Sequence, residues 1–172
     1  LERIRVDGHP VGLRLTDLLD ASTIRQGDPF WPLDQPDCIV LDTETTGIEP
    51  DEDEVIEVAA IRLRGGVYSG KPADRFEALL RNTIPVGASE AVHQISDAQL
   101  AAEGQDPVQV LEALSEFIGS LPIAGHNVAF DRRMLENYAA RLGVRLQLHV
   151  RFDTLHMARR LVPDARNHKL GT

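Results

Sequence analysis

Residues 38–47 read CIVLDTETTG, and the predicted sheet is built outward from them. Cys38-Ile39-Val40-Leu41 is a continuous apolar run, which is typical of a β-strand buried on both faces. It predicts a central strand over Cys38–Asp42, flanked by Val55–Leu63 and by a short strand at Ile123. The run leads directly into Asp42 and Glu44, whose side chains share one face because strand side chains alternate. Two carboxylates side by side on a buried face repel each other and lose hydration, so the pair favours a bound cation. The alternative is a strand end that turns into solvent.

The chain after this stretch extends the predicted sheet. We expect strands over Val55–Leu63 and near Phe76–Leu80, with a turn at Gly65-Gly66. Three strands joined by such short links predict an antiparallel meander. Ile123-Ala124 is a further short strand. One more strand is predicted from apolar residues that alternate with polar ones, namely Val144, Leu146, Leu148 and Val150.

Three helices are predicted between and after these later strands. Asp106 can cap a helix that begins at Pro107, a residue favoured at the first helical position. Its apolar stripe comprises Val108, Leu111, Leu114, Ile118 and Leu121. A second helix spans residues 129–142, and a third spans about residues 154–161 with Asp153 as its cap. The order βββαβαβα predicts a mixed sheet with helices packed on it.

Residues 1–37 differ from the rest of the chain. Turn signals are frequent in this segment, with four prolines at positions 10, 29, 32 and 36. A short apolar pattern favours one strand or one helical turn, and it consists of Val11, Leu13, Leu15, Leu18 and Leu19. We interpret residues 1–37 as an extension or interdomain linker beside a domain over residues 38–172. The chain begins with Leu1 and shows no signal peptide, so we expect a processed or partial form of a longer protein.

Composition and charge narrow the class of protein. The 172 residues are 42% hydrophobic and 26% charged, as expected for one soluble globular domain without a membrane span. The single cysteine, Cys38, excludes an internal disulfide and favours the cytoplasm. A net charge of −9 argues against nucleic-acid binding, but residues 131–172 carry nine Lys/Arg against four Asp/Glu. An acidic centre beside a basic flank suits a metal site that meets phosphates, or a protein with uneven surfaces.

Asp131 adds a third carboxylate to this pattern. It occupies the first turn of its predicted helix, on the face that also carries Leu135, Tyr138 and Leu142. A favourable interaction with the helix dipole would explain its position along the helix, but not the face it occupies. Three carboxylates that point inward favour the binding of hard cations such as Mg²⁺ or Mn²⁺, which prefer oxygen ligands. Zinc is disfavoured because these motifs offer no Cys/His cluster.

Two motifs carry a resemblance to a known family. Residues 42–47 (DTETTG) resemble the first motif of the DEDD (Asp-Glu-Asp-Asp) exonuclease superfamily, and residues 126–131 (HNVAFD) resemble the second. Residues 91–95 (AVHQI) and 152–155 (FDTL) resemble the segments before and after the second motif. The match covers about residues 38–172, and it is closest to the branch that contains RNase T and the DNA polymerase III epsilon-like proteins.

The resemblance implies a fold and a set of roles. The fold would be ribonuclease H-like α/β, with three antiparallel strands, then parallel strands, and flanking helices. Catalytic metal ligands for two Mg²⁺ or Mn²⁺ ions would be Asp42, Glu44 and Asp131. Substrate-binding residues would be Thr45, Thr46, Gly47, His93 and Asn127. For His93 the alternative is an ordinary surface histidine, and for Asn127 it is a helix cap.

The resemblance also implies an activity. It would be the hydrolysis of single-stranded or frayed ends in the 3′→5′ direction by two metal ions, in a proofreading role. The protein would act in the cytoplasm and not at a membrane. The partner would be nucleic acid with a free 3′ end, DNA rather than RNA, and a polymerase subunit or upstream domain would be a further partner. The alternatives are a non-catalytic nucleic-acid-binding or scaffolding module, and a transposase or integrase core, which the HNVAFD motif disfavours.

The chain departs from the family pattern at its end. The family's third motif supplies a general base and a fourth carboxylate, spaced His-x-x-x-x-Asp in the histidine branch, and nothing here matches it. Residues 168–171 (HKLG) resemble the loop that opens the next helix, so His168 is not assigned as the base. Asp153 is assigned as a helix cap rather than as the fourth carboxylate. We therefore expect the C-terminal helix of the domain to be missing and the activity of this chain to be very low.

Overall fold

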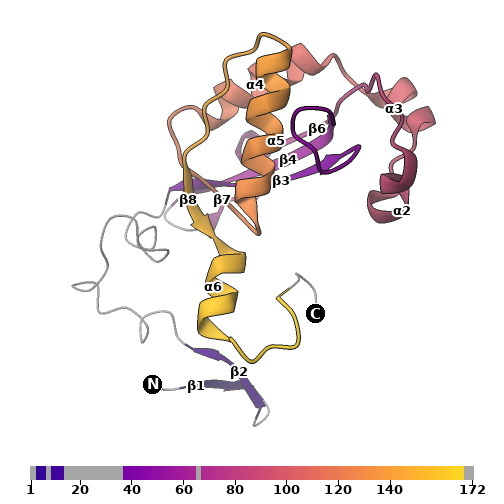
Figure 1. Ribbon diagram of the computed structural model, residues 1–172. Helices are drawn as coiled ribbons and strands as arrows, with labels where there is room; N and C mark the ends of the chain where they lie inside the picture. Colours follow the sequence, from indigo (N-terminus) through magenta and orange to yellow (C-terminus); the bar gives the residue numbers. More distant parts are fainter. Residues whose placement is uncertain (1–2, 7–8, 14–36, 65–66, 169–172) are drawn as a thin grey trace.

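The computed structural model of the protein describes residues 3–6, 9–13, 37–64 and 67–168 (Figure 1). Near the N-terminus, β1 (Arg3–Val6) and β2 (His9–Leu13) pair antiparallel as a separate two-stranded sheet. The apolar pattern predicted in this region therefore falls partly in β2. The rest of that pattern and the predicted turn lie outside the described residues, namely Leu15, Leu18, Leu19 and Gly65-Gly66. The interpretation of residues 1–37 as an extension or linker stays a prediction.

Within the described residues, six strands form the main sheet in the order β5-β4-β3-β7-β8, with β6 also paired to β4. The strands are β3 (Cys38–Thr45), β4 (Val55–Arg64), β5 (Val67–Tyr68), β6 (Arg75–Leu79), β7 (Ile123–Gly125) and β8 (Val150–Asp153). The first four pair antiparallel, whereas β7 and β8 join in parallel. The predicted central position of β3, between β4 and β7, is confirmed, and so is the mixed sheet.

The helices flank this sheet and extend from it (Figure 1). The α-helices in the described part of the chain are α2 (Glu90–His93), α3 (Asp97–Glu103), α4 (Pro107–Ile118), α5 (Val128–Arg141) and α6 (Thr154–Leu161). Helix α5 contacts β3, β4, β7 and β8, which makes it the main helical partner of the central strands. Helices α2 and α3 lie at one end of the sheet, away from α6.

Helix α4 begins as predicted. Asp106 accepts a 3.1 Å hydrogen bond from the backbone N–H of Gln109, which is an N-cap interaction, and Pro107 opens the first turn. The buried face comprises Val110, Leu111, Leu114 and Ile118. Val110 therefore takes the place that the predicted stripe gave to Val108, which is half-buried.

The strand predicted from the alternation over residues 144–150 is wrong, because β8 covers only Val150–Asp153. Leu146 and Leu148 are buried, so the alternation reports that these two side chains face the core, whereas Val150 is exposed. The backbone N–H of Leu148, however, donates to the Glu136 carboxylate at 2.9 Å. A side chain of α5 thus binds this segment where a strand partner would be needed for a sheet.

Among the described residues, two clusters of apolar side chains form the core. The larger one lies between the sheet and helices α4 and α5, and it includes Ile39, Leu41 and Leu135. The smaller one consists of Ile56, Val86, Ile95 and Leu100, and it packs α3 and the segments on either side of α2 against the start of β4. Helices α2 and α3 were not predicted, since both are short and contribute few side chains to a core.

A candidate active site at the end of strand β3

The carboxylates Asp42 and Glu44 lie on the less covered face of β3. Ile39 and Leu41, which point to the other face, are buried, whereas Asp42 is exposed and Glu44 is half-buried. The prediction that both carboxylates share one face is consistent with this alternation, but the prediction that the face is buried is wrong for Asp42. The pairing register with β4 shifts between Glu44 and Thr45. Such irregularities re-aim side chains at the end of a strand.

Negative charge gathers around Glu44. Glu44 stands directly opposite Glu57 of β4, and like charges in that position repel. Partial burial raises the pKa of Glu44, and the charges of Asp42, Glu57 and Asp131 raise it further. The pKa of Glu57 is raised by partial burial and then by the charges of Glu77 and Asp42. No ion pair within the described part of the chain involves Asp42, Glu44 or Asp131.

Asp131 enters the site from α5, and its prediction as an inward-facing residue is confirmed. Its side chain is 4% exposed. Its Oδ1 accepts hydrogen bonds from the backbone N–H of Thr43 at 3.0 Å and from the Thr43 hydroxyl at 2.7 Å. Burial raises the pKa of Asp131 to about 6, with the Asp42 charge acting in the same direction and the Thr43 hydrogen bonds acting against it. Thr43 is a site residue that sequence reasoning missed.

The carboxylates of Asp42, Glu44 and Asp131 are neighbours but do not form a complete metal-binding site. Within the described ranges, no group of three or more His, Cys, Asp or Glu side chains is arranged to hold an ion, so the predicted ligands Asp42, Glu44 and Asp131 do not form such a group. Asp131 turns instead to Thr43, whose side chain points to the opposite face of β3 from Asp42 and Glu44. Mutual repulsion opposes closer approach of the three groups.

The turn after Glu44 is tied together by side chains. The Thr45 hydroxyl donates to the Gly47 carbonyl at 2.6 Å. The Thr46 hydroxyl donates to Oδ1 of Asp53 at 3.0 Å and accepts from the Glu54 N–H at 3.0 Å. A Cβ on Gly47 would lie 2.3 Å from Oδ2 of Asp53, a distance that side chains do not adopt. The predicted substrate-binding residues Thr45, Thr46 and Gly47 therefore form one ordered turn, closed by an aspartate that the prediction did not include.

His93 lies at the last position of α2, half-buried. Its Nδ1 accepts a hydrogen bond from the Ile95 N–H at 3.0 Å, and its Nε2 lies 2.9 Å from the Ser89 hydroxyl oxygen. Burial lowers the pKa of His93, while the charge of Glu90 acts against that shift. Both ring nitrogens are therefore used within the protein, and a contact with substrate would have to replace one of them.

Asn127 precedes α5 in the left-handed conformation, with φ 63°, which Asn tolerates better than most residues. Its side chain is exposed and makes no capping hydrogen bond, so the capping alternative does not describe this side chain. Its backbone N–H donates to Oδ1 of Asp153 at 2.9 Å. The same oxygen accepts from the Leu155 N–H at 2.9 Å, which confirms Asp153 as the cap of α6.

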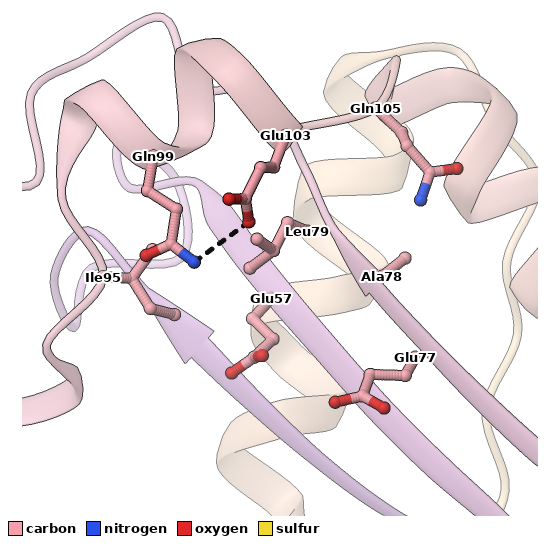
Figure 2. Close-up of a pocket in the computed structure, with 8 residues that line it drawn as sticks. All are labelled: Glu57, Glu77, Ala78, Leu79, Ile95, Gln99, Glu103 and Gln105. Carbon is pink, nitrogen blue, oxygen red and sulfur yellow. Dashed lines mark hydrogen bonds between the residues drawn. The ribbon is translucent and has the colours of Figure 1, made fainter.

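A cavity of about 430 Å³ lies beside the acidic face of the sheet, and Figure 2 shows its lining. Glu57 and Glu77 reach into it from β4 and β6, and Glu103 accepts a 3.2 Å hydrogen bond from the Gln99 amide at its rim. Ala78, Leu79, Ile95 and Gln105 complete the lining. A cavity with three glutamates repels anions such as phosphate.

The family of the chain follows from a comparison with known proteins. A family model described as Exonuclease (RNase_T) matches residues 39–172, the region that carries both motifs and the site. The chain belongs to this DEDD exonuclease family. The predicted resemblance is confirmed, and a transposase or integrase core is not supported.

Similar curated proteins are much longer than this chain. The chain is 28% identical over 172 residues to a DNA polymerase III PolC-type protein of Listeria monocytogenes, a match that covers 96% of the chain and 12% of that protein. It is 33% identical over 169 residues to a DNA polymerase III PolC-type protein of Bacillus subtilis, covering 94% of the chain and 11% of that protein. The chain thus spans about an eighth of the length of these relatives.

Solved structures agree on the fold. Exonuclease I from E. coli in complex with a dT13 oligonucleotide matches with a TM-score of 0.64 and 20% identity, over 77% of this chain and 32% of that chain. Product-bound exonuclease I matches with a TM-score of 0.63 and 21% identity, over 77% of this chain and 34% of that chain. The ribonuclease H-like fold is therefore confirmed. In the part of the chain that the structure describes, no helix has the length and apolar character needed to cross a membrane.

Proposed function

We propose that this chain is the 3′→5′ exonuclease domain of a longer cytoplasmic protein and acts on single-stranded or frayed DNA ends in a proofreading role. The observation that carries the proposal is the position of Asp42, Glu44 and Asp131. They stand at the end of the central strand and the start of α5, repel one another, and share no ion pair within the described residues. Similarity to PolC-type polymerases supports a polymerase context, and the complex of exonuclease I with dT13 supports a DNA substrate.

The donor set of this site suits two Mg²⁺ or Mn²⁺ ions. Asp42, Glu44 and Asp131 offer carboxylate oxygens, the ligands that hard cations prefer, and a cation would offset the repulsion that raises the pKa of Glu44. Both Thr43 hydrogen bonds reach the same oxygen of Asp131, so the other oxygen is not needed to hold its position. When bound, the ions would stabilise the attacking and leaving oxygens of a phosphodiester.

The protein's own residues would select and hold the end of the strand. Thr45, Thr46 and Gly47 follow Glu44 directly, so their turn can surround one terminal sugar but gives a continuing strand no path. The exposed Asn127 amide, which no capping bond occupies, is available to a nucleotide. We propose that His93 reaches the terminal nucleotide by exchanging its Ser89 contact.

The general base and the fourth carboxylate are not assigned to residues of this chain. Nε2 of His168 lies 3.0 Å from the Val162 carbonyl oxygen, in the segment after α6, and this contact gives it no role in the site. Asp153 is engaged by two backbone N–H groups as a cap. General-base catalysis contributes roughly 10²–10⁴-fold, so the chain by itself would degrade DNA very slowly.

A second candidate is a binding or scaffolding module without catalysis. It is favoured by one observation, that no group of three metal-binding side chains is assembled within the described residues. The same fold would then present its ordered turn and exposed Asn127 to a nucleic-acid end without hydrolysing it. The two candidates differ in whether DNA is shortened, which an assay can measure.

The test uses the full-length protein with Mn²⁺ and two oligonucleotides, one labelled at its 5′ end and one blocked at its 3′ end. A ladder that shortens by single nucleotides on the free 3′ end only supports the proposal. Asp42→Asn should abolish the ladder, while Glu112→Gln, which changes an exposed carboxylate on α4, should leave it unchanged. Binding of the oligonucleotide without shortening would favour the module, and cuts within the blocked substrate would overturn the exonuclease proposal.

A further inference from the structure

The turn formed by Thr45, Thr46 and Gly47 is organised around the carboxylate of Asp53. Oδ1 of Asp53 accepts from the Thr46 hydroxyl at 3.0 Å, and Oδ2 accepts from the Glu49 N–H at 2.8 Å. One side chain thus holds Thr46 within the turn and Glu49 just after it. The adjacent Glu54 strengthens the closure, because its N–H donates to the Thr46 hydroxyl oxygen and its carbonyl accepts from the Thr46 N–H at 3.0 Å.

Gly47 is required at its position by Asp53 rather than by its own backbone. The residues with positive φ in the described ranges do not include Gly47, so its backbone conformation is one that alanine adopts. The three heavy atoms nearest to a Cβ built on Gly47 all belong to the Asp53 carboxylate group, at 2.3, 2.6 and 2.6 Å. The glycine and the aspartate therefore fit each other, and each limits what the other position accepts.

Asp53 is in turn anchored to the helix that carries Asp131. The Arg141 guanidinium of α5 donates a hydrogen bond to the Asp53 carbonyl oxygen and lies 5.4 Å from the centre of the Tyr138 ring. Tyr138 is buried on the same face of α5 as Asp131. The turn after Glu44 and the last turn of α5, the helix that carries Asp131 in its first turn, are thereby connected through Asp53, a residue that lies outside the recognised motifs.

We infer that Asp53 is a positioning residue, which holds the Thr45–Gly47 turn in the shape that receives the 3′-terminal nucleotide. The inference rests on the proposed function, since that function places the turn against the nucleotide. Asp53 would act through geometry and not through its charge. It would affect the binding of the terminal nucleotide more than the chemical step, because the turn does not include the carboxylates that would meet the reacting phosphate.

Asparagine at position 53 separates geometry from charge. Its carbonyl oxygen can accept from the Glu49 N–H, and its amide can donate to the Thr46 hydroxyl oxygen, so both contacts can be kept with one of them reversed. Alanine keeps neither contact. If Asp53 were a metal ligand or an electrostatic group, the asparagine and alanine variants would be equally impaired.

The test measures KM and kcat of the full-length protein for a single-stranded oligonucleotide in the presence of Mn²⁺. The proteins compared are the wild type, Asp53→Ala, Asp53→Asn, Gly47→Ala and the Gly47→Ala/Asp53→Ala double variant. Asp53→Ala loses two hydrogen bonds and should raise KM by about tenfold, with a smaller change in kcat. Asp53→Asn should stay close to the wild type. Gly47→Ala should raise KM in the wild-type background and add little in the Asp53→Ala background, because the clash is then absent.

Three results would overturn the inference. The first is an equal effect of Gly47→Ala in both backgrounds, which would mean that Gly47 is kept for the substrate and not for Asp53. The second is an Asp53→Asn variant as impaired as Asp53→Ala. The third is a loss confined to kcat.

Melting temperatures of all variants identify a variant that fails to fold, and Asp53→Asn keeps the test decisive in that case. A wild type that does not shorten DNA fails the proposed function itself, and the inference falls with it; an active wild type with any of the three results fails the inference alone.

Discussion

The Thr43 hydroxyl lies 2.7 Å from Oδ1 of Asp131 and donates a hydrogen bond to it, which joins two residues 88 positions apart in the sequence. Thr43 sits between Asp42 and Glu44, yet its side chain points to the opposite face of β3. The middle residue of the Asp-x-Glu motif is therefore the one that meets α5. Through it the first motif fixes the rotamer of the carboxylate in the second.

Thr43→Val should destabilise the protein by about 1–2 kcal/mol, because it leaves a buried carboxylate with one hydrogen bond fewer at nearly constant side-chain volume. The loss should appear in the free energy of unfolding measured with urea at neutral pH. Thr43→Ser keeps the hydroxyl and serves as the matched control. Equal losses in the two variants would show that the methyl group of Thr43, and not its hydroxyl, supports Asp131.

Asp131 should make the stability of the EDTA-treated protein depend on pH. Burial raises its pKa from an ordinary 3.8 to about 6, so between these values the folded protein binds the proton more tightly than the unfolded chain. The stabilisation from this group is present below about pH 4 and is lost as pH rises through 6, a fall of at most about 3 kcal/mol. Urea unfolding across this range measures it.

Asp131→Asn tests the assignment of that slope. The asparagine oxygen can still accept both hydrogen bonds from Thr43 but does not titrate in this range. The fall in stability between pH 4 and pH 6 should therefore shrink in the variant, and the metal-free variant should be the more stable protein at pH 7. A slope that is unchanged by the substitution would assign the pH dependence to other groups.

Divalent ions should stabilise the folded protein. Mg²⁺ or Mn²⁺ would bind only where Asp42, Glu44 and Asp131 are brought together, so the ions favour the folded state by about 3 kcal/mol when their free concentration is about 100 times Kd. The melting temperature should rise with millimolar Mn²⁺ in the wild type and in the Glu112→Gln control, but little in Asp42→Asn. A melting temperature that Mn²⁺ leaves unchanged in the wild type would contradict the proposed metal site.

The parts of the site that could be predicted are those that periodicity reports. The apolar run over residues 38–41 predicted a central strand, and the spacing of Asp131 from Leu135 and Tyr138 predicted its inward face; both are confirmed. Apolar residues that repeat every two positions in a strand, or every 3.6 positions in a helix, lie on one face of that element. Their side chains pack against one core, so the repeat indicates which side chains face it.

Other parts depend on which elements meet, and periodicity does not report that. Thr43 gains its role only because α5 covers the opposite face of β3 from Asp42. Asp53 belongs to an acidic run, Asp51-Glu52-Asp53-Glu54, in which nothing local distinguishes it from its neighbours. The alternation over residues 144–150 reported the burial of Leu146 and Leu148 but not that of Val150, which is exposed, and it did not report pairing, because Glu136 of α5 binds the Leu148 N–H.

Glu57→Gln should make the EDTA-treated protein more stable at neutral pH. Glu57 faces Glu44 directly across the two strands, and the charges of Glu77 and Asp42 raise the pKa of Glu57 further after partial burial. Removing one charge should relieve repulsion worth roughly 0.2–1 kcal/mol, and it should lower the pKa of Glu44, which the Glu57 charge raises. Because a raised carboxylate pKa means stability that is lost as pH rises, the gain should be present at pH 7 and absent near pH 3, where Glu44 and Glu57 are protonated. Glu112→Gln, on an exposed face of α4, controls for the change in net charge.

With millimolar Mn²⁺ the gain in stability of Glu57→Gln should shrink, since the ions already offset the negative charge around Glu44. A variant that is stabilised equally at pH 3 and pH 7 would show that packing of the glutamine, and not relief of repulsion, is the cause.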